Sequence, residues 1–130
     1  MRMLSQEEEK DADVEVNWED QQRINTFSKL NTRVQNLTAE LETAKREKEA
    51  LDDISTELEL ADEDQPVMYR VGETFVHLPL EQAQERLATE KEAAEIEVAR
   101  LQDEVDGCQT SMKDLKLHLY SKFGNSINLD

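Results

Sequence analysis

The sequence predicts a mainly α-helical protein in which two long helices form an antiparallel coiled coil and a β-hairpin joins them. Each half of the chain carries a heptad pattern of apolar residues, and two β-prone runs flank Gly72 between the halves. Only 37% of the 130 residues are hydrophobic and 5% are aromatic. So small an apolar fraction favours long paired helices, because one compact core would not offset the conformational entropy of the chain.

The first helix is predicted over residues 17–60, after an acidic disordered tail over residues 1–16. Asn17 is a suitable N-cap residue, and Glu19 and Asp20 place negative charge in the first turn. Apolar residues then recur at alternating steps of three and four, the spacing of coiled-coil core positions: Phe27, Leu30, Val34, Leu37, Leu41, Ala44, Leu51 and Leu58. Such a pattern requires a partner helix that covers it.

The connection between the helices is predicted to be a loop over residues 61–66 and a β-hairpin over residues 67–78. Pro66 ends any helix, and Gly72 suits the first central position of a two-residue type II′ turn. One face of the hairpin then carries Val67, Tyr69, Val71, Thr74, Val76 and Leu78, and the other carries Met68, Arg70, Phe75 and His77. Because apolar residues lie on both faces and both edges are unpaired, strands from other chains are expected to complete the sheet.

The second helix is predicted over residues 79–123, with Pro79 in its first turn and a C-terminal tail over residues 124–130. Its core positions are apolar or carry a thiol: Ala94, Val98, Leu101, Val105, Cys108, Met112, Leu115 and Leu119. Polar residues fall at four core positions towards the hairpin: Lys48, Ser55, Gln84 and Lys91. That end of the coiled coil is therefore expected to depend on neighbouring chains, and the protein is expected to be an oligomer.

The open end of the coiled coil is rich in aromatic residues, with Trp18, Phe27, Tyr120 and Phe123 all predicted there. This is more apolar surface than two helices need to bury, and such surface on an acidic protein is typical of an interaction site. Alternatively, the C-terminal tail folds back and covers it. Both interpretations hold together if the cover is loose.

Composition and motifs exclude most other kinds of chemistry. A net charge of −16 argues against nucleic-acid binding, and no run approaches the about 18 apolar residues of a membrane span. His77 and His118 are expected to be solvated or packed, Cys108 to be a core residue, and the acidic run at Asp62 to be a solvated loop. No enzyme activity, metal or cofactor is expected. The expected location is the cytoplasm, and the sequence leaves an additional nuclear role open.

Motifs at both ends of the chain resemble those of the prefoldin family, in particular its β-type subunits. They are Glu19-Asp20-Gln21-Gln22-Arg23-Ile24-Asn25, Leu115-Lys116-Leu117, Leu119-Tyr120-Ser121-Lys122-Phe123-Gly124 and Ile127-Asn128-Leu129. The resemblance covers residues 14–130 and includes Leu60-Ala61-Asp62 and the hairpin around Gly72.

The resemblance implies a heterohexamer of two α-type and four β-type subunits, so that this chain would join two α-type and three further β-type partners. The hairpins would assemble into a β-barrel platform. The tips of the coiled coils would hold unfolded proteins, notably actin and tubulin, and transfer them to the cytosolic group II chaperonin without ATP. Position predicts the tip contacts Ile24, Phe27, Leu117, Tyr120, Phe123 and Ile127, and the assembly contacts Tyr69, Val71, Phe75 and Val76.

A structural coiled-coil tether, which joins two partners without binding unfolded chains, is the competing hypothesis. Its coiled coil would look the same. The two hypotheses differ at the hairpin, which needs partner strands, and at the off-core apolar residues of the open end. A tether predicts a homodimer that does not suppress aggregation, whereas a chaperone subunit predicts five companion chains.

Overall fold

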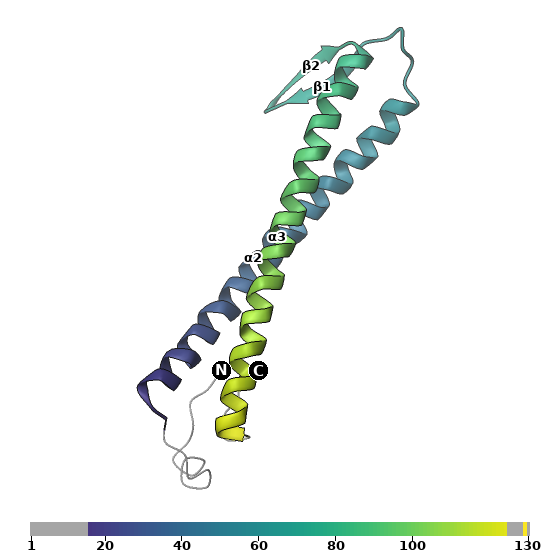
Figure 1. The fold of residues 1–130 in the computed structure, drawn as a ribbon. Coiled ribbons are helices and arrows are strands. Elements are labelled where there is room, and N and C mark those ends of the chain that lie inside the picture. The colour runs from purple at the N-terminus through teal and green to yellow at the C-terminus, as the bar shows by residue number, and fades with distance from the viewer. Residues whose placement is uncertain (1–15, 125–128, 130) are drawn as a thin grey trace. The chain divides into compact units, whose positions relative to one another are not determined.

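In the computed structural model, which describes residues 16–124 and 129, a two-stranded antiparallel sheet lies between two long helices in the order of the chain. The order of elements is α2 (Trp18–Glu59), β1 (Val67–Val71), β2 (Thr74–Leu78) and α3 (Leu80–Phe123) (Figure 1). This confirms the predicted fold class. The predicted tails lie outside the described residues, apart from Val16, Gly124 and Leu129.

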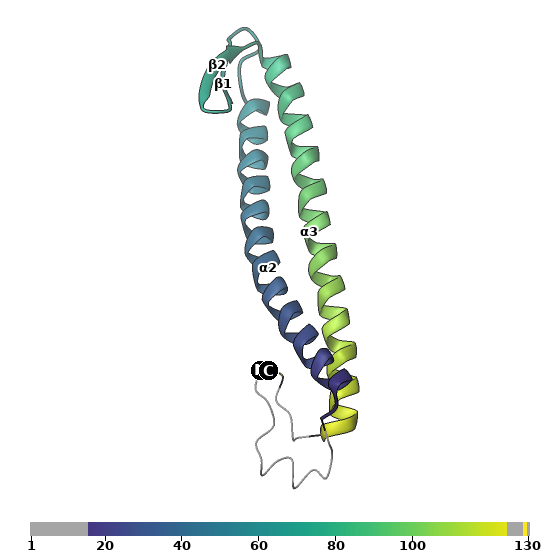
Figure 2. The same cartoon turned by 90° about the vertical axis from the view of Figure 1, so that its left-hand side faces the viewer.

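The chain divides into two compact units, and α2 and α3 each contribute to both. We call residues 1–39 and 102–130 the terminal unit and residues 40–101 the hairpin unit. In the terminal unit the start of α2 packs on the end of α3, and in the hairpin unit the end of α2 lies beside the start of α3 (Figure 2). The two helices therefore run antiparallel within each unit.

Asn17 caps α2 as predicted. The backbone N–H of Asp20 donates to Asn17 Oδ1 at 2.8 Å, and the N–H of Gln21 donates to the Asn17 carbonyl at 3.0 Å. At the other end, the N–H of Leu60 donates to the Glu57 carbonyl at 3.2 Å, a three-residue spacing that tightens the last turn. Local hydrogen bonds thus pair one of the backbone groups that each end of α2 leaves without a partner inside the helix.

The heptad pattern agrees with the observed burial. Its core positions are buried or half-buried along both helices, and this includes the polar Lys48, Ser55 and Lys91. Gln84 is the exception, because the structure buries Ala83 completely and leaves Gln84 exposed. The prediction for Gln84 was wrong by one position. The small Ala83 side chain fits between Leu80 and Leu87, which are also buried, whereas the longer amide remains in water.

The hairpin has the predicted register. Val67 pairs with Leu78, Tyr69 with Val76 and Val71 with Thr74, and these three pairs lie on one face. Gly72 has a φ of 64°, the left-handed conformation that its turn position requires and that glycine adopts without strain. The hairpin packs on the helices through a buried cluster: Leu58, Tyr69, Leu80, Ala83 and Leu87, flanked by Leu51, Ala61, Val67 and Leu78.

The core of the terminal unit comes from the first turns of α2 and the last turns of α3. It consists of Ile24, Phe27, Leu119, Phe123 and Leu129, flanked by Val16, Met112, Leu115 and Tyr120. Among the described residues, neither helix contains a stretch long and apolar enough to cross a membrane.

Candidate functional site

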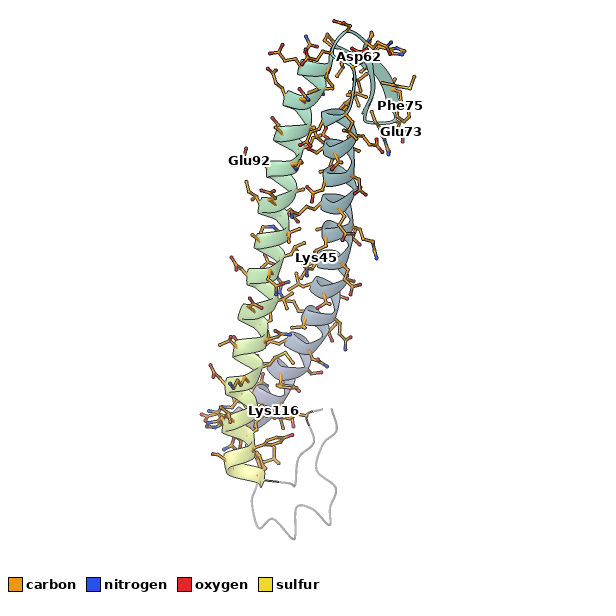
Figure 3. All side chains as sticks on the ribbon, turned by 90° about the vertical axis from the view of Figure 1, so that its right-hand side faces the viewer. Lys45, Asp62, Glu73, Phe75, Glu92 and Lys116 are labelled. Atoms are coloured by element: carbon orange, nitrogen blue, oxygen red, sulfur yellow. The ribbon has the colours of Figure 1, made fainter. Side chains whose placement is uncertain are left out.

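The outer face of the hairpin exposes large apolar side chains. Met68 and Phe75 are each 61% exposed, and both lie on the face opposite Tyr69 (Phe75 is labelled in Figure 3). Val71 and Val76 are also exposed, although they share a face with Tyr69. A group of exposed large apolar side chains of this kind usually marks a protein contact. Val71, Phe75 and Val76 are three of the four predicted assembly contacts, and that role stays a prediction.

Tyr69, the fourth predicted assembly contact, is buried within its own chain. Its hydroxyl donates to Glu90 Oε2 on α3 at 2.9 Å, which fastens the hairpin to the helix. Burial raises the pKa of Tyr69 to about 12, and the hydrogen bond to the Glu90 carboxylate and its negative charge act in the same direction. The position of Tyr69 is therefore that of an internal anchor for the hairpin.

A cleft of about 620 Å³ lies between α2 and the hairpin, entirely within the hairpin unit. Ile54, Leu58, Met68 and Phe75 contribute apolar side chains to it, and Arg70 contributes a charge. Met68 and Phe75 line this cleft and are also exposed, so they belong both to the cleft and to the exposed face of the hairpin.

The predicted tip contacts divide into buried and exposed residues. Ile24, Phe27 and Phe123 are buried in the core of the terminal unit, whereas Leu117 is 61% exposed. Tyr120 is half-buried, with Lys116 Nζ 5.6 Å from the centre of its ring (Lys116 is labelled in Figure 3). Ile127 lies outside the described residues.

For Ile24, Phe27 and Phe123, this burial corrects the expectation that the apolar residues of the open end are surplus to the packing of two helices, whereas Trp18 and Leu117 are exposed as that expectation requires. Ile24 and Phe27 pack against Leu119 and Phe123, and Leu129 joins the same cluster. Burial of Leu129 agrees with the alternative in which the C-terminal tail covers this surface. Binding of unfolded protein by the six predicted residues stays a prediction.

Trp18 is an exposed residue that the predicted contact set omitted. It lies in the first turn of α2 with 74% of its surface accessible. It is the only tryptophan of the chain and falls outside the heptad pattern, and these two features are the signal that could have identified it. With Leu117 it is one of two large apolar side chains that are exposed among the described residues of the terminal unit.

Asp20 is a second residue whose importance the sequence did not show. Its carboxylate, with a side chain 1% exposed, forms ion pairs with Lys122 at the end of α3 and with Arg23 Nη1 at 3.0 Å. Burial by itself would raise the pKa of Asp20. The hydrogen bond and charge of Lys122, the Asn17 backbone N–H and the hydrogen bond from Arg23 together hold the pKa below its ordinary value.

The described residues contain no group of three or more His, Cys, Asp and Glu side chains that could hold a metal ion. In the acidic loop, Asp62 Oδ1 accepts the backbone N–H of Asp64 at 3.0 Å, which is a local turn contact. Each buried side-chain nitrogen or oxygen of the described residues has a hydrogen-bond partner. The features of the described residues that bear on function are therefore the exposed apolar side chains and the buried contacts of Tyr69 and Asp20.

Comparison with known proteins gives consistent results along nearly the whole chain. The sequence profile of the family described as "Prefoldin subunit" matches residues 21–126. The chain is 41% identical to probable prefoldin subunit 4 of Drosophila melanogaster over 118 residues, or 91% of this chain and 86% of that protein. It is 40% identical to prefoldin subunit 4 of Saccharomyces cerevisiae, over 89% of this chain and 90% of that protein. It is 37% identical to prefoldin subunit 4 of Homo sapiens, over 91% of this chain and 89% of that protein.

A solved structure shows the same fold. The crystal structure of the prefoldin beta subunit from Thermococcus strain KS-1 superposes with a TM-score of 0.76, covering 85% of this chain and 96% of that one. Sequence identity to it is 16%, so this likeness concerns the fold alone.

Proposed function

This chain belongs to the prefoldin subunit family, and we propose that it acts as a β-type subunit of a heterohexamer of two α-type and four β-type chains. As a member of the family it is a chaperone subunit that assembles with other prefoldin subunits. The proposal adds that the complex binds unfolded actin and tubulin without ATP and transfers them to the cytosolic chaperonin. It also adds that the complex works in the cytoplasm.

The exposed apolar face of the hairpin carries the proposal. An isolated two-stranded hairpin is marginally stable in water, and this one exposes Met68 and Phe75 on its outer face. Each strand has one edge without a partner strand among the residues that the structure describes. Strands of neighbouring subunits would pair with these edges, and their apolar side chains would cover Met68 and Phe75.

Binding of unfolded protein is supported by the exposed Trp18 and Leu117 of the terminal unit. Two apolar side chains give only weak binding on their own. Six such units in one complex would act on the same unfolded chain, and their contacts would strengthen one another by multivalency. No enclosed pocket is needed for this kind of binding.

Native mass and composition of the purified complex test the proposal. The chain would be tagged, purified from extract of its own cells, and measured by native mass spectrometry. A particle of about 90 kDa, six times the 15.0 kDa of this chain, with five small partner chains would support it. A particle of about 30 kDa that contains this chain alone would contradict it.

A structural tether is the second candidate function, and burial of Ile24, Phe27 and Phe123 favours it. A tether needs no exposed apolar tip, and these three residues are sufficiently explained by packing inside their own chain. Aggregation of chemically unfolded actin, followed by light scattering, separates the two functions. The complex should suppress the scattering if it is a chaperone and leave it unchanged if it is a tether.

A further inference from the structure

We infer that the Asp20–Lys122 ion pair holds the core of the terminal unit closed and thereby controls access of unfolded polypeptide to Ile24, Phe27 and Phe123. The consequence for unfolded polypeptide rests on the proposed function. The closure itself does not, because it concerns only packing within this chain.

The ion pair joins the two helix ends that form this core. Asp20 lies in the first turn of α2 and Lys122 in the last turn of α3, 102 residues apart in sequence. Ile24 follows Asp20 by one helical turn, and Phe123 follows Lys122 directly; both are core residues. The ends of α2 and α3 therefore cannot separate, and the core cannot open, without breaking this pair.

The carboxylate of Asp20 is stabilised by a partner that only the closed core provides. It is fully buried, and a buried carboxylate is stable only where cations and hydrogen-bond donors surround it. Lys122, Arg23 and the backbone N–H of Asn17 supply them. Asn17 and Asp20 are local to α2, as is Arg23, so Lys122 is the one partner among them that links α2 to α3.

The residues behind the ion pair are better suited to bind an unfolded chain than those already exposed. Trp18 and Leu117 are the exposed large apolar side chains of the terminal unit where the structure describes it. Opening would add two phenylalanines and an isoleucine to them. Because apolar contact area largely determines how strongly an unfolded chain is held, a closed core would limit binding and an open core would increase it.

A second ion pair in the same unit provides a matched control. Arg33 Nη2 of α2 lies 3.4 Å from Glu104 Oε2 of α3, so this pair also joins the two helices. Its side chains are considerably more exposed than Asp20, and its loss would leave no buried charge behind. Arg33→Met therefore removes a cross-helix ion pair without affecting closure.

The first test measures opening directly by hydrogen–deuterium exchange of the full chain, assembled with its companion subunits. The variants are Lys122→Met, Asp20→Asn, the double variant and the control Arg33→Met. Lys122→Met leaves the helix cap intact and should accelerate exchange in residues 20–27 and 116–123 on the order of tenfold, the effect of losing one charged hydrogen bond. Exchange in the hairpin unit should not change.

The double variant shows whether the two side chains act through each other. If they do, Asp20→Asn and the double variant should open the core to similar extents, Lys122→Met should open it at least as much because it leaves the buried carboxylate without its cross-helix cation, and Asp20→Glu, which keeps the charge, should leave the core closed. Normal exchange in Lys122→Met would overturn the inference, because the effect of Asp20 would then come from the cap alone. Equal acceleration in Arg33→Met would also overturn it, because the effect would not be specific to the buried pair.

The second test measures capture of chemically unfolded actin by the same complexes. Lys122→Met should suppress aggregation at a several-fold lower concentration than wild type, with unchanged complex composition. Unchanged or weaker suppression, together with faster exchange, would show that opening does not control access and would overturn that part of the inference. If wild type itself suppresses no aggregation, the proposed chaperone function fails, whereas the exchange experiment still decides whether the ion pair closes the core.

Discussion

The terminal unit and the hairpin unit differ in how much of their large apolar side chains is exposed to solvent. The terminal unit buries Ile24, Phe27 and Phe123 behind an ion pair, whereas the hairpin unit leaves Met68 and Phe75 in solvent beside an open cleft. Surface that is always exposed is suited to permanent subunit contacts. Apolar side chains that are buried in a small core can bind a partner only when that core opens.

Charge follows the same division. Residues 40–101 contain 18 acidic and seven basic side chains, whereas the terminal unit, residues 1–39 and 102–130, contains 13 acidic and eight basic side chains. Charged side chains such as Lys45 and Glu92 project from the helices of the hairpin unit (Figure 3). Strong net charge keeps a surface soluble and repels acidic chains, so the terminal unit, with a net charge of −5 against −11 for the hairpin unit, is the part of the molecule that accepts an acidic unfolded chain with less repulsion.

Substitution in the core of the terminal unit should have the largest effect on stability. Leu119 is completely buried, and Leu119→Ala should lower the free energy of unfolding by about 2–5 kcal/mol because it leaves a cavity. Leu117→Ala, two residues away and at an exposed site, is the matched control and should change it by less than about 0.5 kcal/mol. Urea denaturation followed by circular dichroism measures both, and equal effects would contradict the division into buried and exposed residues.

Substitution on the hairpin should affect assembly more than stability. Phe75→Ser should weaken incorporation into the complex by roughly thirtyfold, the effect of losing one interface residue worth about 2 kcal/mol. The fold of the single chain should be preserved, because Phe75 packs little against it. Native mass spectrometry of co-expressed subunits gives the incorporated fraction. Glu73→Ser, in the turn, should assemble normally, and normal assembly of Phe75→Ser would show that this face is not an interface.

The ion pair of the terminal unit should make stability depend on pH in acid. Because the pKa of Asp20 is lowered from 3.8 in the folded protein, its contribution is complete above that value and is lost as the pH falls through the lower folded pKa. Asp20→Asn should therefore lower the free energy of unfolding by about 1.5–3 kcal/mol at pH 7. Denaturation at pH 7, 5 and 3 should show the difference from wild type decreasing only at the lowest pH. A difference that is constant with pH would exclude a role for the charge.

The anchor of the hairpin unit should have the smallest effect. Tyr69→Phe removes one hydrogen bond to Glu90 and should lower the free energy of unfolding by about 0.5–1.5 kcal/mol. Since the pKa of Tyr69 is raised from 10.0 to about 12, the contribution is complete below pH 10 and is lost as the pH rises towards 12. Absorbance at 295 nm should lose its step near pH 12 in this variant, whereas Tyr120→Phe should retain that step.

Much of the fold could be predicted because the signals for it are local. The three–four spacing from Phe27 to Leu58 identified the buried side of α2, and Asn17 identified its start. Gln84 shows where this reasoning failed. The pattern extended backwards from Ala94 falls on Gln84, whereas packing selected the neighbouring Ala83, because the hairpin and Leu80 set the start of α3.

The candidate site was less predictable than the fold. The aromatic content of the open end was visible in the sequence, but whether Phe27 and Phe123 face water or each other depends on how two distant segments pack. The same is true of Tyr69, which shares a strand face with exposed valines yet is buried in the cluster with Leu58 and Leu80 and donates a hydrogen bond to Glu90.

The sequence by itself determined two helices, a hairpin with its register, and an acidic surface, because periodicity, turn chemistry and charge act over a few residues. Only the tertiary structure decided that Asp20 meets Lys122, that Leu129 joins the core of the terminal unit, and that the outer face of the hairpin is exposed. These features depend on side chains far apart in the chain. Their energies arise from burial and pairing, and neither exists until the helices come together.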